Sequence, residues 1–386
     1  MDFNLNDEQR MLQETVERLV SSEYDIETRH KYAESEEGFS RDVWSQFAEM
    51  GLLGVPFAEE YGGFGGGGLE LMVIMQAFGR GLVVEPYLST VVLAGTLISD
   101  AGNDAQREKY LTAIAEGQTL ASLAHGEPDS RYTLSRVSTK ADKSGDGYKL
   151  SGHKAVVLNG DTADVLVVSA RVSGDVDAED GIALFLVDPK ANGVRVRGYR
   201  TVDGGRAAEV YLENVEVGAD AVLGEPGKAY AHIERAAGRG IVALCAEAVG
   251  AMEVQCDMTL DYLKQRKQFG VPIGSFQVLQ HRMVDMRVKL EEARTMAILA
   301  ACNEQFEDPK QQLRTLSGAK LLIGQHGRFI SEESIQLHGG IGMTWEYAGA
   351  HYAKRLVMID HILGDVDYHL QRYSDLMEGP VDDAAL

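Results

Sequence analysis

Two segments of the chain combine arginine, glutamine and glycine in an order that suits a phosphate-bearing ligand. The residues that could contact such a ligand are Arg266, Phe269, Gln277, Gln336, Gly339 and Gly340. Paired glycines after a helix let backbone N–H groups approach an anion or a heteroaromatic ring, while arginine and glutamine supply guanidinium and amide contacts to a diphosphate. The alternative for the paired glycines is an ordinary helix C-cap.

Glu247 is the second candidate for chemistry, because it is a carboxyl within an otherwise apolar run from Ile241 to Met252. If the run is helical, Glu247 lies about two turns beyond Gly240 on the same face. A carboxyl in such surroundings could act as a general acid or base. The alternative is a buried polar contact inside a helical bundle or between subunits.

Other catalytic chemistries lack their motifs. The ten histidines show no HExxH spacing and no Cys/His cluster, which argues against a metal site. No GxSxG elbow and no phosphate-binding P-loop pattern occurs. The cysteines, Cys245, Cys256 and Cys302, form no CxxC pair and are odd in number, so we expect no disulfide framework and a reducing compartment.

Charge and hydropathy exclude further classes of partner. The chain has 386 residues and carries 37 Lys and Arg against 59 Asp and Glu, a formal net charge of −22. Such a field repels phosphate backbones and anionic lipid surfaces, so we expect no nucleic-acid and no membrane partner. The polar N-terminus and the lack of a bilayer-length apolar run predict a cytoplasmic protein.

The elements that must position these residues follow from the periodicity of the sequence. Three domains are predicted, over residues 1–119, 120–227 and 228–386. In the first, amphipathic helices begin after a capping pair at Asn6 and Gln9 and after Ser40. The second shows alternating apolar residues and turn dipeptides, which predict antiparallel strands, with a fully buried strand over Ile182–Val187.

The third domain returns to helical periodicity almost to the end of the chain. Long helical segments are predicted over 229–269, 276–306 and 311–337. Short connections containing glycine and proline make successive helices antiparallel neighbours, as in a bundle.

Together with this order of domains, the motifs resemble those of the acyl-CoA dehydrogenase family over essentially the whole chain. The resemblance rests on Arg266–Gly270 with Gln277, on Gln336–Gly342 with a downstream arginine, and on Glu59–Gly63. It implies an α+β, mainly α fold: an N-terminal helical domain, a middle antiparallel β-barrel or sandwich, and a C-terminal four-helix bundle.

The resemblance also implies a cofactor, partners and a reaction. FAD would lie between subunits of a tetramer, with Arg266, Phe269 and Gln277 at its diphosphate and adenine side. From the neighbouring subunit the site would be completed by Gln336, Gly339 and Gly340. The family reaction removes the α-proton of an acyl-CoA thioester with a carboxylate while a hydride leaves Cβ for flavin N5. An electron-transfer protein is the expected partner.

The sequence departs from the family pattern around the reacting groups. The two positions at which family members carry the catalytic glutamate are Gly364 and Gly240 here, and Asp365 follows the first of them by one residue. Val156 and Leu158 stand where Trp and Thr commonly flank the isoalloxazine. The residues that match the family's contacts to the FAD diphosphate and adenine, which we call the nucleotide-half residues, are therefore kept. The residues beside the isoalloxazine and at the two base positions are changed.

We therefore predict an FAD-dependent acyl-CoA dehydrogenase chain that converts a bulky, branched or dicarboxylic acyl-CoA to the trans-2-enoyl-CoA, with Glu247 or Asp365 as the base. The alternative is a non-catalytic subunit that completes the FAD site and stabilises a hetero-oligomer. The pattern of losses resembles that of the small subunit of pimeloyl-CoA dehydrogenase and of partner chains in two-gene bacterial acyl-CoA dehydrogenases. We expect a homotetramer, or a heterotetramer with a homologous subunit.

Overall fold

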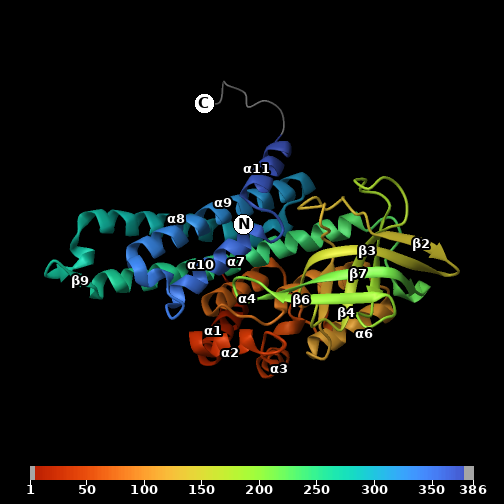
Figure 1. The fold of residues 1–386 in the computed structure, drawn as a ribbon, viewed down its shortest axis with the longest axis horizontal. Helices are drawn as coiled ribbons and strands as arrows, with labels where there is room; N and C mark the ends of the chain where they lie inside the picture. The colour runs from red at the N-terminus through yellow and green to blue at the C-terminus, as the bar shows by residue number, and fades with distance from the viewer. Residues whose placement is uncertain (1–4, 378–386) are drawn as a thin grey trace.

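The computed structural model describes residues 5–377, in which helices are followed by strands and then by helices again (Figure 1). The N-terminal elements are α1 (Asp7–Glu23), α2 (Ile26–Glu34), α3 (Arg41–Glu49), α4 (Gly68–Gly81), the π-helical η3 (Leu88–Ala94), α5 (Gly95–Ala101) and α6 (Asp104–Ala115). Asn6 and Gln9 form the predicted capping box of α1, and Ser40 caps α3. The predicted fold class is confirmed.

The middle of the chain forms one sheet. Its strands are β1 (Ala121–Ala124), β2 (Lys140–Ser144), β3 (Gly147–Leu158), β4 (Val165–Arg171), β5 (Ile182–Val187), β6 (Val194–Arg200), β7 (Arg206–Val217) and β8 (Val222–Leu223). They lie in the order β6-β7-β3-β2-β4-β5-β8, with β1 paired to β4. Most pairs are antiparallel, as predicted, but β1 and β2 run parallel to β4. The long connections before β4 make that arrangement possible.

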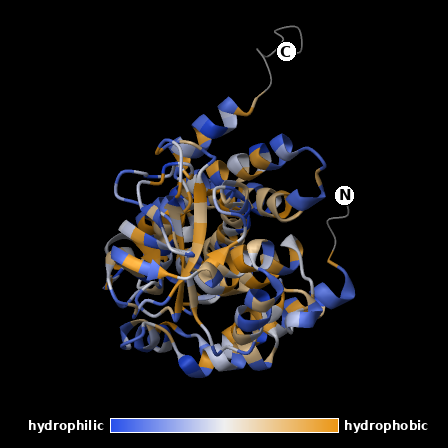
Figure 2. Cartoon of the chain, turned by 90° about the vertical axis from the view of Figure 1, so that its right-hand side faces the viewer, coloured by the Kyte–Doolittle hydropathy of each residue, from blue (hydrophilic) through white to orange (hydrophobic). Residues whose placement is uncertain are grey.

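The central strands of the sheet are buried on both faces. β5 is buried throughout, as predicted. β4 is also buried throughout. The reason is that Val165 and Val167 join the core shared with the helices, whereas Leu166 and Val168 join a second core on the other face of the sheet. Figure 2 shows the hydrophobic residues gathered in the interior between these layers.

The C-terminal elements form the bundle. They are α7 (Tyr230–Gln265), the hairpin β9 (Lys267–Gln268) and β10 (Val271–Pro272), α8 (Gln277–Ala301), α9 (Pro309–His338), α10 (Ala348–His361) and α11 (Val366–Asp375). α7 is the central helix, in contact with α4, α8, α9 and α10. It ends four residues before the predicted boundary because Phe269 and Gly270 adopt positive φ values of 54° and 82° in the hairpin.

Candidate functional site

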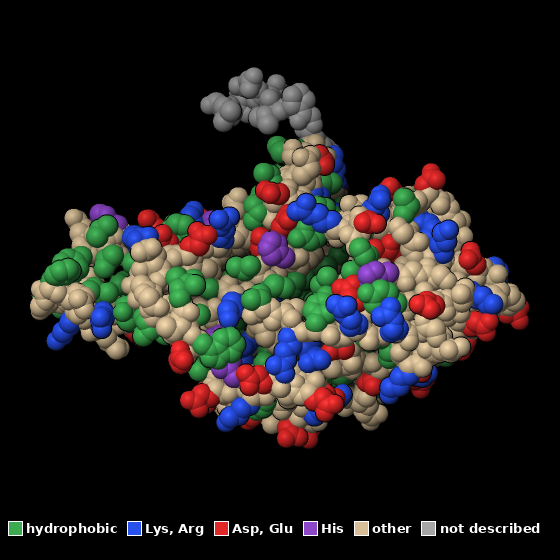
Figure 3. Space-filling view, in the orientation of Figure 1, with side chains coloured by type: hydrophobic (Ala, Val, Ile, Leu, Met, Phe, Trp, Pro, Cys, Tyr) green, Lys and Arg blue, Asp and Glu red, His purple; other side chains and the backbone are tan. Residues whose placement is uncertain are grey.

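The first candidate nucleotide-binding segment lies at the exposed tip between α7 and α8. Arg266 is the C-cap residue of α7, and Gln277 begins α8. Phe269 is 92% exposed and meets Phe276 edge-on, with ring centroids 6.2 Å apart. Hydrophobic side chains gather at this end of the bundle (Figure 3). An exposed apolar patch of this kind indicates a surface that another molecule covers.

The second candidate segment follows α9 and reaches the same end of the bundle. Gly339 has a φ of 64°, and a Cβ built there or at Gly340 would have no neighbour within 4 Å. The ring of His338 lies 4.4 Å from that of Tyr262, which is one helical turn before Arg266. Within residues 5–377, Arg266 has no carboxylate partner. An open glycine backbone and an unpaired guanidinium fit a diphosphate.

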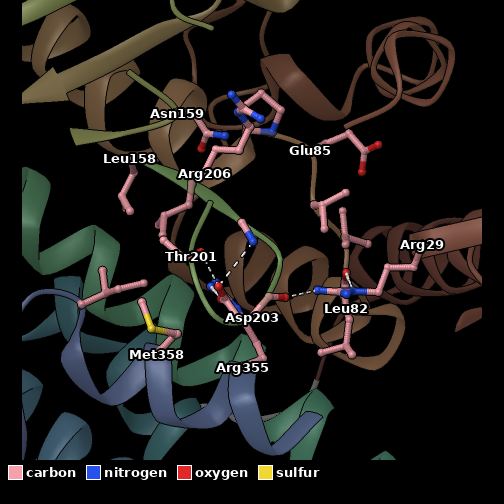
Figure 4. A pocket seen from close by; sticks show the side chains of 16 residues that line it. Arg29, Leu82, Glu85, Leu158, Asn159, Thr201, Asp203, Arg206, Arg355 and Met358 are labelled. Atoms are coloured by element: carbon pink, nitrogen blue, oxygen red, sulfur yellow. Dashed lines mark hydrogen bonds and ion pairs between the residues drawn. The ribbon is translucent and has the colours of Figure 1, made fainter. Parts of the chain in front are cut away.

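Glu247 lies in a buried ion pair. Its carboxylate accepts two hydrogen bonds from Arg355, at 2.5 Å from Nε and 2.7 Å from Nη2. Arg355 Nη1 also donates at 2.8 Å to Asp203, in the turn between β6 and β7 (Figure 4). Burial opposes the charge on Arg355, but the carboxylates of Glu247 and Asp203 raise its pKa above the ordinary value.

This network decides what Glu247 can do in the single chain. A bidentate pair with arginine engages both carboxylate oxygens of Glu247. Glu247 is only 3% exposed, both of its oxygens face Arg355 of α10, and it does not line the cavity to which Arg355 contributes. The geometry favours the alternative interpretation, a buried polar contact inside the bundle, over a general base, and Arg355 extends that contact to the β6–β7 turn through Asp203.

Asp365 is a helix cap. One carboxylate oxygen accepts a hydrogen bond from the Tyr368 N–H at 2.9 Å, and the other lies 3.0 Å from Arg131 Nη2. Burial alone would raise its pKa, but the Tyr368 N–H and the Arg131 guanidinium lower the pKa of Asp365 below its ordinary value. A carboxylate with both oxygens engaged at the start of α11 suits capping better than proton abstraction.

The two glycines at the family's base positions come together in space. A Cβ built at Gly240 would collide with Leu363 and lie 2.8 Å from Leu93 Cδ2. Gly364, next to Leu363, has a φ of 109°, and a Cβ there would collide with His369. A side chain at either position would therefore require these neighbours to shift.

A small cavity lies beside these positions. Its walls include Leu88, Leu158, Asp203, Arg355 and Ile362, and we term it the closed chamber (Figure 4). Its volume is about 80 Å³. Pockets that hold small ligands usually measure roughly 300–1,000 Å³. In the single chain the closed chamber has no room for a bulky acyl group.

Glu85, in the wall of the closed chamber, was not singled out by sequence analysis. Burial raises its pKa to about 7. The Tyr24 hydroxyl donates to one of its oxygens, and the Ser40 N–H donates to the other at 3.2 Å. The available signal was its place in the apolar run Leu82–Pro86. Because both oxygens have donors, Glu85 ties α1 and α3 to the segment before η3.

A second buried polar cluster lies under β3. Lys154, fully buried, donates at 2.6 Å to Glu127 and at 3.1 Å to Ser169, and His125 Nδ1 lies 2.8 Å from the same Ser169 hydroxyl. Burial lowers the pKa of His125 to about 3 and that of Lys154 to about 8. These groups satisfy one another. Val156, also on β3, is 56% exposed, so an apolar side chain is exposed at the position that the resemblance assigns to a residue beside the flavin.

Comparisons with known proteins agree with this fold. Residues 6–118, 122–215 and 232–369 match the N-terminal, middle and C-terminal domain models of acyl-CoA dehydrogenases. The chain is 31% identical to the probable acyl-CoA dehydrogenase YngJ of Bacillus subtilis, over 90% of this chain and 92% of that protein. Within residues 5–377, no helix is long and apolar enough to cross a membrane.

Two solved structures that are similar to the chain contain two named components. One is a variant of the steroid ACAD Tcur3481-Tcur3483, with a TM-score of 0.86 and 29% identity over 96% of this chain and 97% of that one. The other is the ChsE4-ChsE5 complex from Mycobacterium tuberculosis, with a TM-score of 0.88 and 26% identity over 99% and 100% of the two chains.

Proposed function

The chain belongs to the acyl-CoA dehydrogenase family, whose members are FAD-dependent oxidoreductases acting on CH–CH bonds, and from this premise we propose that it is the subunit without the catalytic base in a two-chain acyl-CoA dehydrogenase. One observation carries the proposal: the two base positions, 240 and 364, are glycines, and a Cβ at either would require Leu363, Leu93 or His369 to shift. A second, homologous chain would then supply the carboxylate that removes the α-proton.

The nucleotide-half residues give this subunit its share of the cofactor site. When bound, FAD supplies the hydride acceptor of the family reaction. In this chain Arg266 and Gln277 would hold the diphosphate, Phe269 would cover the adenine side, and the second segment would complete the site across a subunit interface. The exposed tip and the open backbone at Gly339 and Gly340 support these roles.

In the proposed function, the residues of this chain around the closed chamber have a structural role. Leu363 and Leu93 exclude water and substrate from the base positions, and Arg355 fixes α10 against α7 and the sheet. The acyl group would be held mainly by the second chain. The two-component relatives support such a division, and the word steroid in the name of one of them favours a bulky acyl-CoA as the substrate of the pair.

An absorption experiment tests the proposal. The chain is purified alone and, separately, co-expressed with a homologous chain from the same genome, and the flavin spectrum is recorded before and after anaerobic addition of acyl-CoA thioesters. We expect that no thioester bleaches flavin bound to the chain alone and that at least one bleaches the pair. Bleaching of the chain alone would overturn the proposal and restore the prediction of a self-sufficient enzyme.

Matched variants of this chain, each tested in complex with the second chain, separate the role of Arg266 from that of the Arg355 network. Arg266→Ala should lower FAD retention, whereas Lys267→Ala, at an exposed neighbouring position, should leave it unchanged. Glu247→Gln and Asp203→Asn each weaken the same Arg355 network, so we expect similar, small losses of turnover from both. A loss of about 10²-fold or more from Glu247→Gln alone would identify Glu247 as the base.

A further inference from the structure

Three rings from separate parts of the chain meet at the connection from α9 to α10. The ring of Trp345, between η7 (Gly339–Met343) and α10, stacks on that of His30 in α2, with centroids 5.2 Å apart. The ring of His351, in the first turn of α10, meets both edge-on, 4.7 Å from Trp345 and 4.4 Å from His30. We term these three residues the ring cluster. It joins the N-terminal helices to the C-terminal bundle.

The ring cluster is one of two anchors for the backbone at Gly339 and Gly340. His351 donates from Nε2 to the Trp345 carbonyl at 2.8 Å, which fixes the end of the connection nearest α10. At the other end, His338 is the last residue of α9 and is buried. A Cβ built at either glycine would have no neighbour within 4 Å. The position of this open backbone therefore depends on the residues that flank it.

The arrangement of the ring cluster suits neutral histidines. The Nε2 atom of His30 is buried and has no hydrogen-bond partner within residues 5–377. An imidazolium carries an N–H on both ring nitrogens, so protonation would place a donor without an acceptor at this atom, and a buried donor of that kind is costly. Protonation of His351 as well would put two positive rings 4.4 Å apart.

The charged side chains that face the ring cluster add mostly positive charge. Lys354 of α10 has its Nζ atom 4.6 Å from the centroid of the Trp345 ring, and Arg29 precedes His30 in α2. Burial lowers the pKa of both histidines, and the charges of Arg29 and Lys354 lower it further. Glu34 opposes this effect at the histidine of α2, and the Trp345 carbonyl opposes it at the histidine of α10.

We propose that the ring cluster is a pH-sensitive clamp on the backbone that carries Gly339 and Gly340. When both histidines are neutral, they hold Trp345 against α2 and α10. When they are protonated, they release the connection formed by residues 344–347. The clamp is a property of this chain alone, whereas its consequence, weaker retention of FAD in acid, rests on the proposed function.

The direction of the pH dependence follows from proton linkage. Histidines released from the clamp have the ordinary pKa of about 6.5 and those in the clamp have lower pKa values, so the closed clamp binds fewer protons. The stability of the closed clamp is therefore complete above about pH 6.5. It is lost as the pH falls below that value, toward the pKa of the clamped rings.

Hydrogen exchange of the full-length chain tests the clamp directly. The N–H groups of Thr344 and Tyr347 donate to backbone carbonyls within the connection, so their protection reports its closure. Between about pH 7.5 and pH 5, we expect peptides covering residues 339–350 to lose roughly tenfold protection beyond the change in intrinsic exchange, while peptides of α4 keep theirs. Unchanged protection of residues 339–350 would overturn the proposal.

Tryptophan emission gives an independent measurement, because the chain has two tryptophans and Trp44 is buried in the core. In Trp44→Phe the emission comes from Trp345 alone. We expect one acid transition with a midpoint below about pH 6.5, while circular dichroism stays constant. A titration without that transition would contradict the proposal.

Two substitutions remove the titrating groups and keep the contacts. His30→Phe keeps a ring against Trp345, and His351→Gln keeps an N–H donor for the Trp345 carbonyl. In the double variant the acid loss of protection should fall below about twofold. His361→Gln, at the exposed last residue of α10, should leave the loss at its wild-type value. The full acid loss in the double variant would overturn the proposal.

Retention of FAD by the co-expressed pair at the two pH values tests the consequence for the cofactor. We expect an acid loss in the wild type that the double variant lacks, and equal losses in both would overturn that consequence. The exchange and emission measurements involve neither FAD nor the second chain. A failure of the clamp is therefore distinguishable from a failure of the proposed function.

Discussion

The closed chamber and the open cleft, which is the cavity bounded by the loop Gly66–Gly68, the first third of α7 and the α8–α9 connection, both reach η3. They differ in size and in how their walls are held. The closed chamber measures about 80 Å³ and is lined by Asp203 and Arg355 of the buried ionic network. The open cleft measures about 590 Å³ and is lined mainly by small and apolar residues. The comparison teaches that the region where the family places its reacting groups is filled, while ligand-sized space persists elsewhere in the chain.

The walls explain the difference physically. Around the closed chamber, Arg355 draws α7, α10 and the β6–β7 turn together, and Leu363 then fills the space at Gly240. Around the open cleft, the ion pairs lie at the mouth and the floor has no charged residue to draw its elements together. Variants that weaken the Arg355 network should therefore lower the free energy of unfolding substantially. Matched variants in the walls of the open cleft should lower it little.

The largest effect is expected from Arg355→Met. The change leaves the buried carboxylates of Glu247 and Asp203 without their shared cation, and breaking one partner out of a buried pair typically costs about 3–5 kcal/mol. Urea unfolding followed by circular dichroism measures the free energy of unfolding.

Two further variants make that result interpretable. Arg328→Ala removes an exposed arginine that pairs with Glu332, and we expect a change within about 0.5 kcal/mol. The double variant Arg355→Met with Glu247→Leu should be more stable than Arg355→Met alone, because one uncompensated charge is gone. An Arg355→Met protein as stable as the Arg328→Ala protein would contradict the idea that the network holds the closed chamber together.

The sequence predicted what depends on nearby residues. The caps at Asn6 and Ser40, the buried strand β5 and the order of helical and strand regions follow from local spacing and are confirmed. The ionic network could not be predicted in this way, because Glu247 and Arg355 are 108 positions apart. The parallel pairing of β1 with β4 also depends on how distant segments meet.

The candidate site shows the same difference between short-range patterns, which the sequence reveals, and long-range contacts, which it does not. Motif spacing identified the nucleotide-half residues, which are short-range patterns at the ends of α7 and α9, and their roles remain predictions. The apolar run around Glu247 indicated burial correctly but gave no information about its partner. Likewise, the glycine at position 240 indicated the loss of a base, but not that Leu363 fills the space.

An intermediate effect is expected from adding one methyl group at Gly240. In Gly240→Ala the new Cβ would collide with the side-chain ends of Leu363 and Leu93, and overpacking typically costs about 1–3 kcal/mol, of which about 1 kcal/mol is offset because alanine suits the interior of α7 better than glycine. Shortening the opposing side chain in the double variant Gly240→Ala with Leu363→Ala should recover part of that loss relative to Leu363→Ala alone. Thermal and urea unfolding measure both quantities.

The matched change in the open cleft is Gly67→Ser. A Cβ there would have no neighbour nearer than 3.8 Å, and Gly67 is the N-cap residue of α4, a position that serine favours. We expect a change within about 0.5 kcal/mol. If Gly240→Ala were tolerated as well as Gly67→Ser, the space at Gly240 would be open, and the contrast between the two cavities would fail.

A smaller effect than that of Arg355→Met is expected at Asp365, where the contact is local. Asp365→Ala removes the cap of α11 and should lower the free energy of unfolding by about 1 kcal/mol, whereas Asp365→Asn keeps a capping oxygen and should cost less.

The folded pKa of Asp365 is lowered, so the contribution of its charge to stability is present above the ordinary pKa of about 3.9 and is lost as the pH falls through the folded pKa. The difference between wild type and Asp365→Asn should therefore disappear in acid, while part of the Asp365→Ala loss remains, because a protonated carboxyl still accepts the Tyr368 N–H. Urea unfolding at neutral and acidic pH measures both differences; equal losses from Asn and Ala at neutral pH would assign the role of Asp365 to its charge and its contact with Arg131 instead of the cap.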